Sequence, residues 1–108
     1  MTHFMIFQIN TERDTNRVAF EPYGRLARYQ GSAKPDKSLY DKVYETDMNV
    51  NNLEDIYRIF NVERPKDYRG RSLSVSDIVT VTKSNSIGPG SYYCDSIGFK
   101  KLETIIII

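Results

Sequence analysis

The sequence predicts an α+β fold: a single domain over residues 1–108, with a mixed or mainly antiparallel sheet of about five strands and two helices packed on one face. Two patterns lead to this prediction. The pattern of residues 53–81 predicts, in order, an amphipathic helix, a cationic loop and a strand rich in β-branched residues. Residues 3–9 alternate two sets that are both largely apolar, which is typical of a strand covered on both faces. A chain of 108 residues can bury one core without a disulfide framework or a structural metal.

The first half of the chain is expected to place strands on either side of one helix. After the strand at 3–9, the polar run 10–16 breaks the alternation, and residues 18–20 are expected to form a short strand. Proline at position 22 predicts a helix over residues 22–29, since the first helical position leaves its amide hydrogen unbonded in any case. Tyrosine and valine in the run 39–46 predict a further strand after a loop that contains glycine and proline.

The second helix is predicted by apolar residues at helical spacing, namely Leu53, Ile56, Tyr57 and Phe60. Asn51 precedes this apolar face and Glu54 follows three residues later, which resembles a capping box with asparagine as the cap. Pro65 ends the helix because it forces Arg64 toward an extended conformation. Residues 64–71 are therefore expected to form a loop.

The end of the chain predicts a hairpin and one more strand. The β-branched run 78–82 is the clearest strand signal in the sequence. Residues 84–90, with glycine on both sides of proline, supply a wide turn into residues 91–95, so the two segments are expected to pair as an antiparallel hairpin. Residues 99–108 predict a last strand that finishes in four isoleucines. These isoleucines are expected either to be buried against the sheet or to leave an edge through which the chain forms a homo-oligomer.

Composition narrows the classes of partner. Fifteen basic against fourteen acidic residues give a net charge of +1. A protein that imitates DNA is expected to be strongly acidic, and one that coats nucleic acid without sequence preference strongly basic, so neither class fits. Cys94 is the only cysteine, the chain opens without a secretory signal, and the isoleucine tail is too short to cross a membrane. These features predict a cytoplasmic protein with no membrane role.

The cationic loop is the strongest candidate for a functional site. Its basic and aromatic residues are Arg64, Lys66, Tyr68, Arg69 and Arg71, opposed only by Asp67. Guanidinium groups match phosphate oxygens and an exposed tyrosine can stack on a base, so this set suits a partner-binding surface for a nucleoprotein or RNA. A charged loop that is merely solvated, or one in which Arg69 or Arg71 pairs with Glu54, Asp55 or Asp77, explains the pattern equally well. We expect Tyr68 to lie outside the core and Tyr57 inside it.

Structural roles explain the other residues that could suggest binding or catalysis. A second basic group is expected to be a solvated face, and consists of Arg13, Arg17, Arg25 and Arg28. The serines near Asp77 have no adjacent base, because the only imidazole, His3, is far away in sequence. Asp77 and Asp95, with Glu63, suggest an alternative hypothesis of a metal-assisted RNA nuclease. Capping of loops by the two aspartates is favoured over that hypothesis, so no catalytic residue, metal site or cofactor is predicted.

Three segments carry a resemblance to a known family. They are Leu53-Glu54-Asp55-Ile56-Tyr57 with Phe60-Asn61, the run from Pro65 to Val79 that contains Arg-Gly-Arg-Ser-Leu-Ser-Val-Ser-Asp, and Tyr92-Tyr93-Cys94-Asp95-Ser96-Ile97-Gly98-Phe99. The chain resembles the YodL-like domain family, well over its second half and loosely over its first fifty residues. Cys94 stands where an apolar residue such as valine is expected, which suggests a packing role.

The resemblance implies a setting in conjugative elements and phages of Firmicutes, and no settled chemistry. Small proteins in that setting often disable host defence. The partner it implies is a host CRISPR effector such as Cas9, together with its guide RNA, and the function it implies is stoichiometric inhibition by an anti-CRISPR protein.

Overall fold

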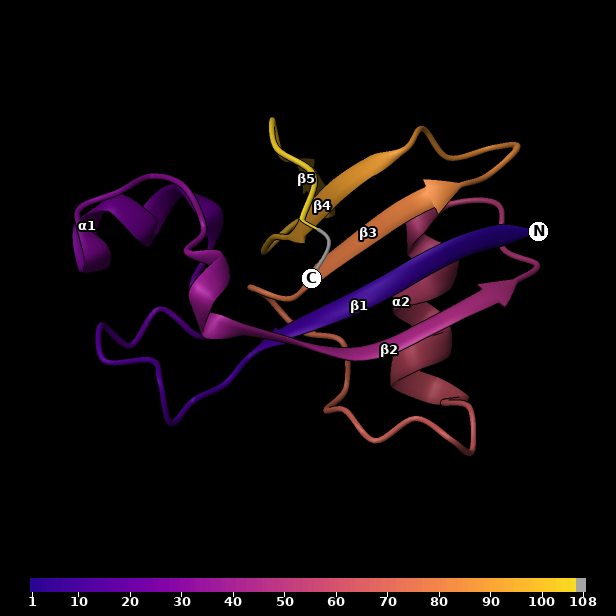
Figure 1. The fold of residues 1–108 in the computed structure, drawn as a ribbon, viewed down its shortest axis with the longest axis horizontal. Helices are drawn as coiled ribbons and strands as arrows, with labels where there is room; N and C mark the ends of the chain where they lie inside the picture. The colour runs from indigo at the N-terminus through magenta and orange to yellow at the C-terminus, as the bar shows by residue number, and fades with distance from the viewer. Residues whose placement is uncertain (107–108) are drawn as a thin grey trace.

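A five-stranded antiparallel sheet forms the centre of the molecule in a computed structural model, which describes residues 1–106 (Figure 1). The strand order is β2-β1-β3-β4-β5. The elements are β1 (Thr2–Ile9), the 3-10 turn η1 (Tyr23–Arg25), α1 (Leu26–Gln30), the 3-10 turn η2 (Lys37–Leu39), β2 (Tyr40–Met48), α2 (Leu53–Val62), β3 (Ile78–Lys83), β4 (Gly90–Cys94) and β5 (Phe99–Lys101). The predicted α+β fold is confirmed.

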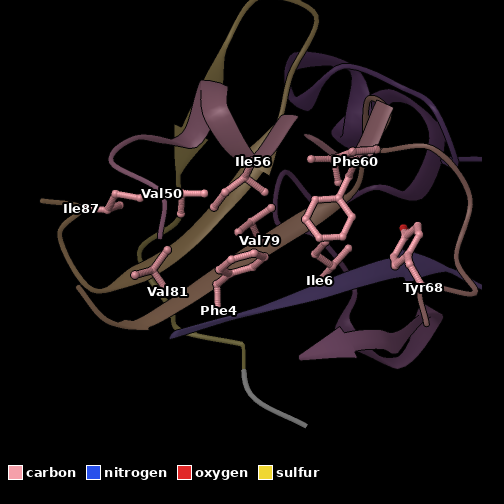
Figure 2. Packing of buried hydrophobic residues seen from close by; sticks show 10 residues of the cluster. Phe4, Ile6, Val50, Ile56, Phe60, Tyr68, Val79, Val81 and Ile87 are labelled. Atoms are coloured by element: carbon pink, nitrogen blue, oxygen red, sulfur yellow. The ribbon is translucent and has the colours of Figure 1, made fainter. Parts of the chain in front are cut away.

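Strand β1 has apolar side chains on both faces because both faces of the sheet are covered. Phe4 and Ile6 point into a core with Ile56 and Phe60 of α2. Figure 2 shows Phe60 between Ile6, Val79 and Tyr68, and the Phe4 and Phe60 rings pack edge to face at 5.9 Å. The alternation of residues 3–9 therefore predicted this strand correctly.

The opposite face of the sheet carries a second core. Met5, Phe7 and Ile9 pack there with Leu26 of α1 and with Tyr93. The two helices thus lie on opposite faces, and the expectation that both pack on one face is wrong. The physical reason lies in β1 itself: each of its two apolar faces needs its own cover, and one helix cannot shield both.

Helix α2 begins one residue later than predicted. Asn52, and not Asn51, is the cap, since its side-chain oxygen accepts a hydrogen bond from the Asp55 amide at 2.8 Å. The Asp55 carboxylate in turn accepts from the Asn51 amide at 3.2 Å, so Asp55 takes the reciprocal role that was expected of Glu54. The rest of the helix runs as its apolar spacing predicts.

Residues 18–20 do not form the short strand that was expected. The Asp14 carboxylate accepts hydrogen bonds from the amides of Val18 and Ala19, at 2.9 and 2.8 Å, so neither amide is available to a neighbouring strand. The helix predicted over residues 22–29 is split into the 3-10 turn and the short α1, and Gly31 ends it at a left-handed φ of 81°.

The last strand is also shorter than predicted. β5 ends at Lys101, after which the chain leaves the sheet and crosses the face that carries Thr80 and Ser91. Ile106 is buried there: its amide donates to Ser91 Oγ and its carbonyl accepts from Thr80 Oγ1, both at 2.7 Å. The last two isoleucines of the predicted strand lie outside the described residues. Within residues 1–106, no helix is both long and apolar enough to cross a membrane.

Candidate functional site

The cationic loop leaves the end of α2 and returns to the sheet at β3. Residues 64–71 contain no helix or strand, as predicted. The side chains of Arg64, Lys66, Arg69 and Arg71 are exposed, whereas Tyr68 is buried at 7 % exposure. The loop therefore presents its charges to solvent while one aromatic ring holds it against the core.

Tyr68 is the anchor of the loop. Its ring packs edge to face with Phe60 at 5.0 Å (Figure 2). It packs in the same way with Tyr44 at 5.4 Å. Its hydroxyl donates to the Arg71 carbonyl at 2.6 Å. Burial raises the pKa of Tyr68 to about 12, so the hydroxyl stays protonated and remains a donor at neutral pH.

The expected positions of two tyrosines are reversed. Tyr57 is 44 % exposed on the outer side of α2, and Tyr68 lies inside. The helical spacing placed Tyr57 on the apolar face, but the core is filled from Ile56 and Phe60, which leaves Tyr57 at the margin beside Phe99. Tyr68 cannot stack on a base in this conformation, because its ring is enclosed by the protein.

Gln8 ties the loop to the central strand. Its amide nitrogen donates to the Arg71 carbonyl at 2.9 Å and to Asp77 Oδ2 at 3.0 Å, and its oxygen accepts from the Arg71 amide at 3.0 Å. Gly70 lies against this cluster: a Cβ atom there would sit 2.5 Å from the Tyr68 hydroxyl oxygen and 2.9 Å from Gln8 Oε1. Glycine at position 70 allows the loop backbone to approach this closely.

Asp77 is a fully buried carboxyl at the foot of the loop. Its Oδ2 accepts from the Ser74 amide at 2.8 Å and from Gln8, and among residues 1–106 its Oδ1 has no hydrogen-bond partner. Burial raises the pKa of Asp77 to about 7, against the opposing effect of the Ser74 and Gln8 hydrogen bonds and of the nearby Arg71 charge. The group closes the loop and does not face solvent.

The charges of the loop are left without acidic partners. In the part of the chain that the structure describes, none of Arg64, Lys66, Arg69 and Arg71 forms an ion pair. The only acid of the loop, Asp67, accepts a hydrogen bond from the Tyr44 hydroxyl at 2.8 Å. Arg69 donates to the Lys66 carbonyl at 2.8 Å, an exposed hydrogen bond that leaves the positive charge uncompensated.

Arg71 differs from the other three cations because its guanidinium is fixed. It donates to the Ile9 carbonyl at 2.9 Å and lies over the ring of Phe20, 5.4 Å from the centroid. Beside it, a hollow of about 250 Å³ is lined by residues of the segment 8–12 and by Asp41 and Val43. No sequence pattern predicted that Phe20 contacts this loop, because Phe20 and Arg71 are far apart in the chain.

A model of the YodL-like domain family matches residues 3–104. The chain belongs to this family. The match covers the first half of the chain as well as the second, so the family extends over the whole sheet and beyond the segments that first carried the resemblance. No curated protein and no solved structure matches the chain.

Two of the segments that carry the family resemblance hold loops on the sheet of this YodL-like domain. In the run from Pro65 to Val79, Gly70 and Asp77 fix the cationic loop, and Ser76 adopts a left-handed φ of 83° with its amide bonded to the Cys94 carbonyl. In the second, Tyr93 donates to the Glu21 carbonyl at 2.6 Å and the Asp95 carboxylate accepts from the Tyr23 and Ser96 amides. Both motifs therefore serve the scaffold, as the capping interpretation of the aspartates predicted.

The other candidate residues of this YodL-like domain have structural surroundings. Cys94 is buried, and burial raises the pKa of its thiol to about 12. Arg13 pairs with Asp41 at 2.7 Å, and Arg25 lies 3.9 Å from Glu21, so two of the second basic group have acidic neighbours. Residues 1–106 contain no group of three or more histidine, cysteine or acidic residues that could hold a metal ion.

Proposed function

We propose that this YodL-like domain is a non-catalytic binding protein of a mobile genetic element that acts by occupying a surface of a host defence nucleoprotein. The partner we propose is a Cas9-type CRISPR effector, with its guide RNA as the anionic component. The contact surface is the cationic loop, through Arg64, Lys66 and Arg69, with Arg71 at its edge. The family resemblance supports the mobile-element setting, and the exposed charges of the loop support the contact surface.

One observation carries the choice of surface. The loop backbone is fixed by Tyr68, Gln8 and Gly70, while the positive charges that it bears are exposed and have no acidic partner within residues 1–106. A fixed loop loses little conformational entropy when it binds, which favours affinity. Guanidinium and ammonium groups held outward in this way can engage phosphate oxygens with charge-assisted hydrogen bonds.

The first experiment reverses charge on the loop without touching its anchors. We expect Lys66→Glu with Arg69→Glu to abolish capture of the partner when tagged protein is incubated with purified effector, with and without guide RNA. The melting temperature is expected to stay that of wild type, since both side chains are exposed. Arg28→Glu, an exposed charge reversal on α1, is the matched control and is expected to bind normally.

A pull-down from host lysate, with and without RNase, identifies the partner and shows whether RNA bridges the contact. Full capture by the double loop variant would contradict the proposed surface. Capture of proteins unrelated to defence nucleoproteins, lost in the loop variant, would contradict the proposed partner and leave the surface in place.

A further inference from the structure

Two irregular loops meet at the end of the sheet where β1 ends and β3 begins (Figure 1). One comprises residues 10–22 and the other residues 63–77. They are joined by a hydrogen bond of 2.9 Å from the Phe20 amide to Ser76 Oγ, and by the Arg71 guanidinium over the Phe20 ring. Long ordered loops without secondary structure are uncommon in small domains and are usually functional.

Phe20 is held in an unusual conformation on the surface. Its φ is 68°, in the left-handed region, and its side chain is 49 % exposed. A bulky residue in this region is strained, and such strain persists only where the surrounding structure holds the backbone in place, often at functional sites. Here the ring stays half outside the core, so core packing does not account for a phenylalanine at this position.

Phe20 and Arg71 lie together at the surface of the molecule. The guanidinium lies over the ring, 5.4 Å from its centroid, and is held there by its hydrogen bond to the Ile9 carbonyl. Aromatic rings and guanidinium planes are the two surfaces on which unpaired nucleobases stack. The hollow beside Arg71 leaves room for a flat group. Two carboxylates line it: that of Asp41 is bonded to Arg13 and Asn10, and that of Glu12 belongs to an exposed residue.

Positive charge lies on both loops around this surface. Arg17 precedes Phe20 by three residues and is exposed, and the cations Arg64, Lys66 and Arg69 lie on the other loop. None of these four forms an ion pair within the described chain. A stacking pair carried on two loops that also bear these unpaired cations fits a ligand that has both a flat base and phosphates.

We propose that the Phe20–Arg71 stack binds an unpaired base of single-stranded RNA. The inference rests on the proposed function, because the cationic loop supplies the phosphate contacts on one side of the stack. The Phe20 ring also supplies the aromatic contact that Tyr68 cannot make, because Tyr68 is buried.

The test is fluorescence anisotropy with a labelled single-stranded RNA of about twelve nucleotides. We expect Phe20→Leu to weaken binding by roughly tenfold or more, since removal of one base stack has an effect of this size. Phe20→Gly is expected to do the same while keeping the fold, because glycine adopts a φ of 68° without strain. Tyr29→Leu, which removes another exposed aromatic ring, is expected to bind as wild type does.

Two further arms separate stacking from charge. An abasic strand with the same phosphates is expected to bind wild type and Phe20→Leu equally. The dependence of affinity on salt is expected to be unchanged in Phe20→Leu and shallower in the Lys66→Glu, Arg69→Glu variant, because only the latter loses phosphate contacts.

Wild-type affinity in both Phe20 variants, or no RNA binding by wild type, would overturn the inference. The proposed function fails separately, when the double loop variant still captures the effector. Loss of RNA binding in the loop variant but not in the Phe20 variants would therefore remove the stack and leave the loop as the contact surface.

Discussion

At the scale of single residues, Gly70 decides how closely the cationic loop can lie against the core. Gly70→Ala would place a methyl group 2.5 Å from the Tyr68 hydroxyl oxygen. The tyrosine ring is held between Phe60 and Tyr44, so it cannot turn aside freely. We expect the substitution to lower the free energy of unfolding by about 1–3 kcal/mol, as overpacking does elsewhere. Urea denaturation measures this change.

The control for Gly70→Ala is Gly24→Ala. A Cβ atom at position 24 meets no heavy atom within 4 Å. The two substitutions add the same methyl group, so a stability loss confined to position 70 reports the contact with Tyr68. Equal stability of both variants would show that the loop does not depend on this close approach.

Asp77 predicts how stability changes with pH. The ordinary pKa of an aspartate is 3.8, and burial raises the pKa of Asp77 to about 7 in the folded protein. Between these values the folded protein binds a proton that the unfolded chain has released, so the free energy of unfolding falls as pH rises from the lower value to the upper one. For one such group the slope is at most about 1.4 kcal/mol per pH unit. Denaturant titrations over this range measure it.

Asp77→Asn is the matched variant for that titration. Both hydrogen bonds of the carboxyl go to Oδ2, so an asparagine with its oxygen at that position keeps them. Asparagine does not titrate, and the variant is expected to match wild type at about pH 4 and to exceed it above about pH 8. A constant difference between the two proteins at all pH values would contradict a raised pKa.

The positions of individual side chains were the least predictable part of this molecule. The residues of the cationic loop were recognised from the sequence, but the burial of Tyr68 depends on Gln8 and Tyr44, which are distant in the chain. Gln8 did carry a signal in the sequence, since it is the one polar side chain between Phe4 and Ile9. Phe20 carried none, because its exposure follows from a left-handed backbone that local sequence does not indicate.

At the scale of elements, strands β1 and β2 are joined at one end by a histidine between two acids. His3 Nε2 lies 2.7 Å from Glu45 and its Nδ1 lies 2.9 Å from Asp47, both across the strand pair. These hydrogen bonds, Glu45 first, raise the pKa of His3 above 6.5. The stabilising contribution is therefore complete below 6.5 and is lost as pH rises through the folded pKa.

The titration of His3 tests this arrangement directly. We expect the imidazole resonances in NMR to titrate above the ordinary value, and Glu45→Gln to bring the pKa down more than Asp47→Asn does. Added salt is expected to lower it too, because the cluster is partly exposed. An unperturbed midpoint in wild type would show that the side chains do not hold this geometry in solution.

Elements with a clear periodicity of apolar residues were predicted well. Elements whose ends depend on side-chain hydrogen bonds were not. β1, β3 and α2 follow from alternation or helical spacing in their own residues. Residues 18–20 do not form a strand because the Val18 and Ala19 amides donate to the Asp14 carboxylate. Strand β5 is short because the chain after Lys101 leaves the sheet edge, and the Ile106 amide binds Ser91 Oγ. Neither set of hydrogen bonds follows from the periodicity of the segment that it affects.

At the scale of the whole molecule, the segment after β5 acts as a strap over one face of the sheet. Deletion of residues 105–108 removes the buried Ile106 and leaves the hydroxyls of Thr80 and Ser91 without their partners in the strap. We expect a loss of about 2 kcal/mol or more in the free energy of unfolding. Ser91→Ala removes the hydrogen bonds of the Ser91 hydroxyl with the Ile106 amide and with Thr80 Oγ1 but keeps the buried Ile106 side chain, and is expected to have a smaller effect.

The same deletion tests the prediction that the chain forms a homo-oligomer through its last strand. The terminal edge of the sheet is β5, which has three residues and carries Lys100 and Lys101, a composition that discourages edge-to-edge pairing. Light scattering at high protein concentration gives the mass of both forms. A mass that falls on deletion would support the prediction, and one that is low and unchanged would leave it without support.

The order of the strands also bears on synthesis. β1 emerges first from the ribosome, yet its place is between β2 and β3, with Phe4 opposite Val81. During translation β1 therefore has apolar side chains on both faces and can pair only with β2 until β3 has been synthesised. Until then, this segment is the most exposed target for chaperones and for aggregation.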